Sequence, residues 1–394
     1  MKLPPYPGRD SQPDNPHLAY KFASLLYCWM LLFSSVTDSA PVFTIADLEG
    51  TWYEHELGGG IAPWWAHFTM EIDAGGSLTA NEFLNSTGDS GGPSSGTVNI
   101  NGSGVITVAS QGISAMHGVM SGDRQLIVAT ATEDSGPALI ILQKAGSLFT
   151  QADLMGSWYE HELGSGIAPW WAHFTMEIDA VGSLTATEFL NSAGDSGGPS
   201  SGTINISGNG VVTVASQGIS VLHGVMSEDR QLIVATATED NGPALIILQK
   251  AGGSFTQADL EGTWYEHELG GGADPWWARM TMQINADGSL TATNFMNTAG
   301  DSGGPSSGTI SISGSGVVTV TSLGILALHG VMSGDRQLIV ATATEDNGPA
   351  LILMEKGLPD TDGDGMDDVE EIRQGRNPFV DERTVIILFN TEPD

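Results

Sequence analysis

Short stretches in which apolar and polar residues alternate fill most of the chain, and Gly, Ser, Asn or Asp residues separate them. Alternation with a period of two is typical of a strand with one buried face, and the separating residues favour tight turns. In the first third of the chain the pattern predicts antiparallel strands at residues 51–57, 65–73, 77–85, 96–101, 105–110, 115–120, 125–132 and 138–143. Hairpin turns are expected where Gly or Asn can supply a positive φ.

The same pattern occurs three times. GTWYEHELGGG begins at Gly50 and Gly262, and GSWYEHELGSG begins at Gly156, a constant offset of 106 residues. A repeat of this length predicts three copies of one structural unit. We expect a signal peptide at 1–40, β units at 43–148, 149–254 and 255–357, and a C-terminal tail at 358–394.

Eight meandering strands in about one hundred residues can close into a small barrel, which removes exposed sheet edges. The stretch Leu48-Glu-Gly-Thr-Trp52 resembles the Gly-x-Trp first-strand signature of lipocalin-like and avidin-like barrels. In those families the Trp fills one barrel end beneath a basic residue of the last strand, so the resemblance implies that role for Lys144, Lys250 and Lys356. The predicted fold class is all-β with three tandem eight-stranded barrels. The alternative is one six-bladed propeller with two blades per unit.

The chain is strongly acidic, with 47 Asp and Glu against 13 Lys and Arg, a formal net charge of −34 and a pI near 4.2. This charge argues against nucleic acid or an anionic membrane surface as a partner, because phosphate binding needs clustered Lys and Arg. An apolar fraction of 40% still permits packed cores. The single cysteine, Cys28, leaves no intrachain disulfide.

Residues 1–40 have the pattern of a secretory signal. A start containing Lys2, Arg9 and Lys21 precedes the apolar run at 22–33, and small residues lead to Ala40. The apolar run is too short to span a bilayer comfortably, and no later segment is longer. We therefore expect a secreted protein, extracellular or at the cell surface, without a membrane span.

The segment DTDGDGMDDVEE at 360–371 has the ligand spacing of an EF-hand loop. Such a loop places oxygen ligands at positions 1, 3, 5, 7, 9 and 12 and a Gly at position 6, which suits the six to eight oxygens that calcium prefers. The predicted calcium ligands are Asp360, Asp362, Asp364, Met366 through its backbone carbonyl, Asp368 and Glu371. Calcium is the predicted cofactor.

Residues 360–378 also resemble the thrombospondin type 3-like, EF-hand-like calcium-binding repeats of bacterial secreted proteins. In that family a short helix after the loop ends at a Gly-x-Asn-Pro turn, which Gly375-Arg-Asn377-Pro378 matches. The resemblance implies a structural role in which calcium neutralises the carboxylates and stiffens a junction.

Aromatic, His and Glu residues gather on the first two strands of each unit. Alternation places Phe68, Met70 and Ile72 on one face of the second strand and Trp65 and His67 on the other, so Trp65 is expected to be exposed. Exposed tryptophans stack on sugar rings, which makes an extracellular glycan or a surface protein the candidate partner. The candidate ligand-binding residues are Glu54, His55, Trp65, His161, Trp171, His267 and Trp277.

Two other interpretations of this cluster stay open. The aromatic residues can be ordinary core residues. His55 and His67 with Glu54 or Glu56 also have the donor types of a zinc site, although Arg279 replaces this second histidine in the third unit.

Gly88-Asp-Ser90-Gly-Gly-Pro93 resembles the nucleophile segment of trypsin-like serine proteases. A serine nucleophile needs a His base and an acid that orients it. That family's Ala-Ala-His motif does not occur here, and the segment is present in all three units, each about half the required size. We therefore expect no enzyme activity and a structural loop at Ser90.

The pattern as a whole predicts a secreted, non-catalytic calcium-binding protein whose β units act as binding or surface-architecture modules. A lipocalin-like carrier of small apolar ligands is the first alternative, and a serine hydrolase that uses the GDSGGP segments is the second. Interior volume separates the first two. We expect Phe68, Met70, Ile72, Leu126 and Val128 to fill the barrel and leave little room.

Overall fold

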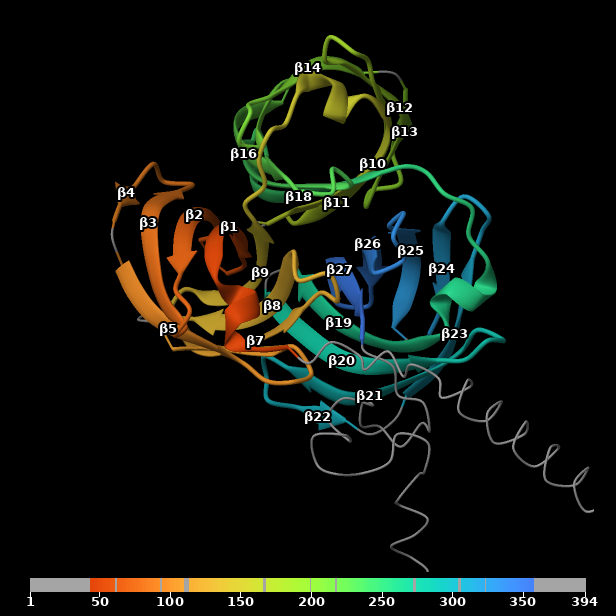
Figure 1. Ribbon diagram of the computed structural model, residues 1–394. Helices are drawn as coiled ribbons and strands as arrows, with labels where there is room; N and C mark the ends of the chain where they lie inside the picture. The colour runs from red at the N-terminus through yellow and green to blue at the C-terminus, as the bar shows by residue number, and fades with distance from the viewer. Residues whose placement is uncertain are drawn as a thin grey trace, which may run out of the picture. The chain divides into compact units, whose positions relative to one another are not determined.

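Each repeat folds into a closed barrel of antiparallel strands (Figure 1). The computed structural model describes residues 43–60, 62–92, 94–109, 113–165, 168–198, 200–216, 218–271, 274–303, 306–322 and 324–357. The first barrel contains the 3-10 helix η1 (Ile45–Leu48) and strands β1 (Gly50–Gly58), β2 (Trp64–Ile72), β3 (Ser77–Asn85), β4 (Ser90–Gly91), β5 (Ser94–Ile100), β6 (Val105–Ala109), β7 (Ile113–Met120), β8 (Leu126–Glu133) and β9 (Gly136–Lys144).

The other two barrels repeat this order of elements. The second contains η2 (Gln151–Leu154), β10 (Gly156–Gly164), β11 (Trp170–Ile178), β12 (Ser183–Asn191), β13 (Ser196–Gly197), β14 (Ser200–Ile206), β15 (Val211–Ala215), β16 (Ile219–Met226), β17 (Leu232–Glu239) and β18 (Gly242–Lys250). The third contains η3 (Gln257–Leu260), β19 (Gly262–Gly270), β20 (Trp276–Ile284), β21 (Ser289–Asn297), β22 (Ser302–Gly303), β23 (Ser306–Ile312), β24 (Val317–Thr321), β25 (Ile325–Met332), β26 (Leu338–Glu345) and β27 (Gly348–Lys356).

Strand pairing closes each sheet within its own repeat. In the first barrel the order is β2-β1-β9-β8-β7-β6-β5-β3-β4, and an additional pairing of β2 with β3 completes the ring. Eight long strands form the barrel, while the two-residue β4 pairs with β3 outside the ring of eight. The predicted fold class is therefore confirmed. The propeller alternative is wrong, because no repeat separates into two independent blades.

One end of each barrel is closed by the Gly-x-Trp tryptophan. Trp52 is fully buried, and its Nε1 donates a hydrogen bond to the backbone oxygen of Leu48 at 2.7 Å. The Nζ of Lys144 lies 5.4 Å from the centroid of this ring and donates to the backbone oxygen of Asp47 at 3.0 Å. Lys250 and Lys356 lie over the equivalent tryptophans, so all three lysines occupy the place that the barrel resemblance implied.

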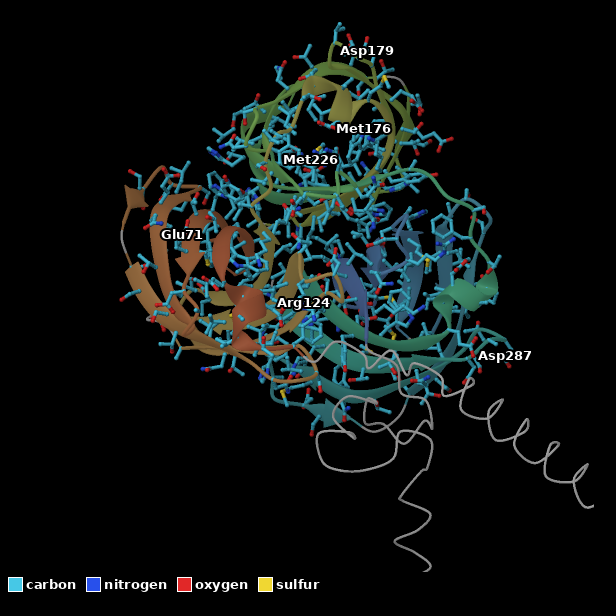
Figure 2. All side chains as sticks on the ribbon, in the orientation of Figure 1. Glu71, Arg124, Met176, Asp179, Met226 and Asp287 are labelled. Atoms are coloured by element: carbon cyan, nitrogen blue, oxygen red, sulfur yellow. The ribbon has the colours of Figure 1, made fainter. Side chains whose placement is uncertain are left out.

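A second contact ties η1 to the same barrel end. The Nε of Arg124 lies 2.7 Å from a carboxylate oxygen of Asp47, and its guanidinium lies over the ring of Phe43 (Figure 2). Cation–π contacts of this kind contribute about 0.5–1 kcal/mol at exposed sites. Packing and an ion pair therefore hold η1 against this barrel end.

The outer faces of four strands per barrel are buried in a core that all three barrels share. In the first barrel the apolar members are Leu57, Trp65, Leu126, Val128, Leu139 and Ile141, and the equivalents of the five aliphatic residues in the other two barrels belong to the same cluster. The prediction that Leu126 and Val128 fill the barrel is wrong. They alternate with the inward-facing Ile127 and Ala129, so they point to the outer face instead.

Indole hydrogen bonds connect the barrels in a cycle. The Nε1 atoms of Trp65, Trp171 and Trp277 each donate at 2.8 Å to a threonine Oγ1 of the next barrel, namely Thr238, Thr344 and Thr132. The third barrel thus bonds back to the first. The predicted exposure of Trp65 is wrong, since the neighbouring barrel leaves only 2% of this residue exposed.

Within the part of the chain that the structure describes, we find no helix of the length and apolarity that a membrane crossing requires.

Substitution of Leu139 by Ala is expected to destabilise the protein by about 2–5 kcal/mol, because it leaves a cavity in the shared core. Leu326→Ala is the matched control, since Leu326 is 69% exposed and its truncation should cost less than about 0.5 kcal/mol. Urea unfolding followed by tryptophan fluorescence measures both values. Equal, small losses for the two variants would contradict a shared core.

Candidate functional site

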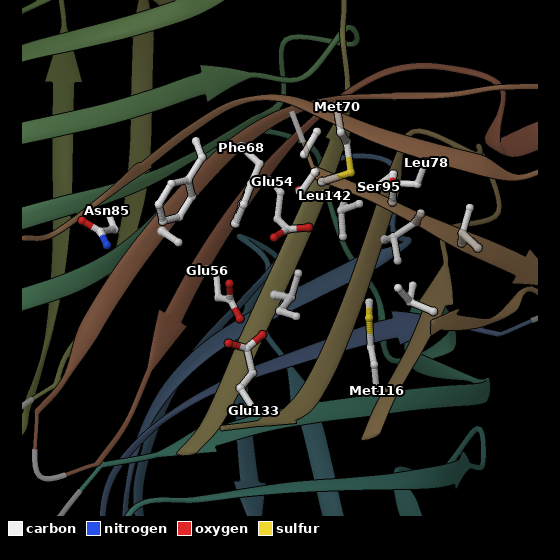
Figure 3. A pocket seen from close by; sticks show the side chains of 18 of the residues that line it. Glu54, Glu56, Phe68, Met70, Leu78, Asn85, Ser95, Met116, Glu133 and Leu142 are labelled. Carbon is white, nitrogen blue, oxygen red and sulfur yellow. The ribbon is translucent and has the colours of Figure 1, made fainter. Parts of the chain in front are cut away.

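The interior of the first barrel contains a cavity of about 890 Å³, and the third barrel contains one of about 770 Å³ (Figure 3). Cavities that hold small molecules are commonly about 300–1,000 Å³. The expectation that side chains leave little room is therefore wrong. The apolar wall of the first cavity includes Phe68, Met70, Ile72, Leu78, Val98, Ile106, Met116, Ile140 and Leu142.

Small inward-facing side chains account for this space. An eight-stranded barrel is just wide enough either for side chains to fill it or for one small ligand. Ala80, Ala129, Ala131 and Ala138 all belong to the interior cluster and contribute little volume. In the second barrel the interior cluster also contains larger side chains, among them Met176 and Met226 (Figure 2).

The cavity reaches the surface at the end opposite Trp52. Ser94, Ser95, Asp134 and Ser135 line it there, and all four residues are exposed. Trp64 also lines this end, and its indole lies so close to Gly58 that a Cβ at that glycine would overlap it. Glycine is therefore needed at position 58, the last residue of β1, for the ring to pack.

Three glutamates stand in the open half of the cavity. Glu54 and Glu56 alternate with Trp52 on β1 and therefore share its inward face, and Glu133 ends β8. Figure 3 shows the carboxyl groups of Glu56 and Glu133 facing each other, and the two share a side-chain hydrogen bond. One carboxyl oxygen of Glu56 has no hydrogen-bond partner, although Glu56 is only 3% exposed.

Burial and mutual repulsion disfavour the charged forms of these glutamates. Burial raises the pKa of Glu54 to about 8, and the charge of Glu133 adds to the effect. Burial raises the pKa of Glu56 well above its usual range, with further contributions from Glu133 and Glu54. Glu54 is partly exposed, and its exposed part faces the cavity because this side chain lines it. Glu160 and Glu266, the counterparts of Glu54, also have a pKa of about 8 because of burial.

The histidines of β1 and β2 face outward and contact the next barrel. His55 is fully buried, its ring centroid lies 4.8 Å from that of His67, and His67 stacks on His223 of the second barrel at 5.9 Å. The pKa of His67 is lowered to about 4, mainly by burial and also by the nearby His223. These rings are thus neutral contact residues near neutral pH.

This arrangement separates the donors of the suggested zinc site. His55 and His67 lie outside the barrel wall, whereas Glu54 and Glu56 lie inside it. Among the described residues no group of three or more His, Cys, Asp or Glu side chains could hold a metal ion.

The predicted ligand-binding residues therefore divide into two sets. Glu54 lines the cavity. His55, His161, His267, Trp65, Trp171 and Trp277 are all buried and do not form an exposed platform. Glu133 was not among the predicted residues, and Glu56 was named only as an alternative zinc ligand. The signal for Glu56 was present, because it keeps the alternation of Trp52 and Glu54.

The predicted calcium loop and the Ser90 segment are not among the described residues that line the barrel cavity. The calcium ligands Asp360 to Glu371 lie outside the described residues, so that prediction stays untested, as does the signal peptide. Ser90 is exposed on β4, where it pairs with Leu84. The preceding turn is held by Asn85, whose side-chain oxygen accepts hydrogen bonds from the backbone of Thr87 and Asp89.

Comparison with known proteins returns no matching family model and no matching curated protein. Among solved structures, transferrin binding protein B from Neisseria meningitidis matches with a TM-score of 0.27 and 9% identity, covering 79% of this chain and 77% of that chain. A double mutant of transferrin binding protein B from Haemophilus parasuis matches with a TM-score of 0.27 and 9% identity, over 78% and 76%. A protein of the DUF3598 family from Nostoc punctiforme matches with a TM-score of 0.21 and 12% identity, over 53% and 99%.

These likenesses are slight and carry no inference about what this chain binds. The expected membership in the thrombospondin type 3-like calcium repeats is wrong, because no family model matches this chain.

Glu54→Gln is expected to stabilise the protein above neutral pH. A carboxyl whose pKa is raised in the folded state keeps its proton between about pH 4.3 and its folded pKa, so the wild type loses stability as pH rises through that window to about 8. The amide has no such loss. The stability difference should therefore grow from pH 5 to pH 8, with an upper bound of about 1.4 kcal/mol per pH unit.

Urea unfolding at pH 5, 6.5 and 8 measures this difference. Glu71→Gln serves as the control, because Glu71 is exposed on the outer surface (Figure 2). A pH-independent difference for Glu54→Gln would show that this carboxyl is ionised in the folded protein throughout.

Proposed function

We propose that the protein is a non-catalytic binding protein whose barrels each take up a small, largely apolar molecule. The observation that supports this most is the apolar cavity of about 890 Å³ in the first barrel, which has a counterpart of about 770 Å³ in the third. It favours the carrier alternative over modules that act only through their outer surface. A closed end at Trp52 and a surface opening beside Asp134 suit one ligand entering from one side.

Several parts of this proposal rest on the sequence. An extracellular or cell-surface location follows from the signal pattern of residues 1–40. The absence of catalysis stays a prediction from the sequence, in which the Ala-Ala-His motif of trypsin-like proteases does not occur. A glycan or a surface protein as a further partner stays a prediction, and the buried Trp65, Trp171 and Trp277 no longer support it.

Uptake of an apolar molecule is tested with the neutral fluorophore N-phenyl-1-naphthylamine, whose emission rises in apolar surroundings. The wild type should bind it in the barrel interiors. Replacement of Ala80, Ala186 and Ala292 by Trp narrows the three interiors and should weaken the signal strongly. The exposed turn residues Ala74, Ala180 and Ala286 provide the matched control, and their replacement by Trp should leave binding unchanged.

Circular dichroism checks that the triple interior variant folds. If it does not, the single variant Ala80→Trp should lower the number of bound fluorophores by one per chain. Binding that is insensitive to both interior variants would place the fluorophore elsewhere and overturn the proposal.

A calcium site in the segment 360–371 is a separate proposal, supported by the complete set of oxygen donors at EF-hand spacing. Calorimetric titration of the full chain with calcium should give one binding event that Glu371→Ala weakens at least tenfold, because this residue would supply two of the ligand oxygens. Glu370→Ala changes the charge equally without touching a ligand position, so it should have a much smaller effect. Equal effects of the two variants would indicate diffuse attraction of calcium to an acidic tail.

A further inference from the structure

The carboxyl groups of the barrel interior point to the chemical class of the ligand. We propose that each barrel binds an organic monocation, an amine with an apolar body, whose ammonium group lies among Glu54, Glu56 and Glu133 or their equivalents. This inference rests on the proposed function, because it names the ligand of the same cavity. The apolar wall would hold the body of the molecule, and the carboxyl end would hold its charge.

The three glutamate carboxyls come from two strands of the barrel wall. Glu54 and Glu56 lie on one face of β1, while Glu133 belongs to β8, with β9 between the two strands. The carboxyls therefore approach the same end of the cavity from different parts of the wall (Figure 3). The apolar residues Met70, Leu78 and Leu142 occupy the remainder of the wall.

Glu56 lacks a hydrogen-bond partner for one of its carboxyl oxygens. This residue is 3% exposed. Among the described residues that line the cavity there is no Lys, Arg or His. Lys144 is engaged at the opposite end with Trp52 and Asp47. Buried carboxyl groups are costly unless they are paired, and a bound ammonium group would supply both the missing charge and the missing donor.

Buried glutamates recur at the equivalent positions of the other two barrels. The cavity of the third barrel is lined by Glu266, Glu268 and Glu345, and Glu268 also has an unpartnered, buried oxygen. Glu162 of the second barrel has the same unpartnered oxygen and is likewise 3% exposed. All three interiors thus present the same acceptor.

Other ligand classes fit less well. A buried anion would be repelled by the three carboxyls. A bare divalent metal would not use the apolar wall, and the described residues contain no group of ligands arranged for one. A neutral alcohol or carbonyl compound could bond to protonated carboxyls, and it is the alternative that the experiment must separate.

Binding of an amine should be coupled to proton release. The groups that face the site are Glu54, Glu56 and Glu133, with Asp134 beside them at the opening. Because the pKa of Glu54 is about 8, this carboxyl holds a proton at pH 6 that an incoming ammonium group must displace. Affinity for an amine should therefore rise between pH 6 and pH 8, whereas affinity for a neutral analogue should not.

The test compares octylamine, 1-octanol and octanoate, which share one apolar chain, by displacement of N-phenyl-1-naphthylamine at pH 8. Octylamine is expected to bind about tenfold more tightly than octanol or better, as charge-assisted hydrogen bonds allow, and octanoate should bind least. Replacement of Glu56, Glu162 and Glu268 by Gln should reduce the preference for the amine several-fold while the fluorophore still binds. The control Glu71→Gln with Glu177→Gln changes exposed outer residues, and the third barrel already carries Gln283 at this position.

Equal affinity for octylamine and octanol, unchanged in the glutamine variant, would overturn the inference and leave the proposed function standing. Failure of the fluorophore and all three ligands to bind would instead reject the proposed function. If the glutamine variant does not fold, calorimetry of the wild type with octylamine in two buffers of different ionisation enthalpy replaces it. Proton release on binding at pH 6.5 supports the inference, and its absence contradicts it.

Discussion

Burial of β1, β8 and β9 on both faces is the constraint on which the rest of the structure depends. Along β9, Ile140 and Leu142 point into the barrel, whereas Leu139 and Ile141 point into the core shared with the other barrels. Strands that are covered on both sides are typically near-continuous apolar runs, as residues 138–142 of β9 are. The barrels therefore cannot separate without exposing a continuous apolar surface, which at about 25 cal/mol per Å² is a strong penalty.

Such an external core explains how the barrel interior can remain partly empty. A small domain usually needs its interior side chains for stability, and an unfilled cavity costs about 1 kcal/mol or more for each missing methyl group. Here the outer cluster around Leu57 and Val128 supplies packing that the alanines on the inner face do not. Trp52 and η1 close one end. The open half is then available for groups such as Glu54, which contribute chemistry rather than packing.

Much of this fold follows from the sequence. The eight long strands of the first repeat lie within a few residues of their predicted positions, and the repeat length with the Gly-x-Trp start predicts closed barrels. Alternation identifies which residues share a face, but it does not say what covers that face. Trp65 was therefore predicted to be exposed, although the second barrel covers it. The unbroken apolar run at 138–142 was a usable signal, because it is typical of strands that are buried on both sides.

Local alternation also could not show which strand face points into the barrel, and this is why the site was predicted on the outside. Glu54 was predicted to form an outer platform with His55 and Trp65. Glu54 and His55 are neighbours on β1, however, and neighbouring residues of a strand face opposite sides of the sheet. Once Trp52 is known to lie inside the barrel, its alternation with Glu54 and Glu56 places both carboxyls inside as well. Glu133 joins them only through the closure of β9 onto β1, a long-range pairing that local pattern does not contain.

The third repeat departs from the other two at its contact with the first barrel. The chain itself links the first barrel to the second and the second to the third, whereas the contact between third and first depends on side chains alone. At that contact Arg279 replaces the histidine found as His67 and His173, and its charge, after burial, lowers the pKa of the facing His117. The histidine pairs of the other two contacts stack at 5.9 and 6.0 Å, which requires at least one neutral ring in each pair. A permanently charged guanidinium beside a neutral imidazole preserves this condition, because the histidine opposite it is held uncharged.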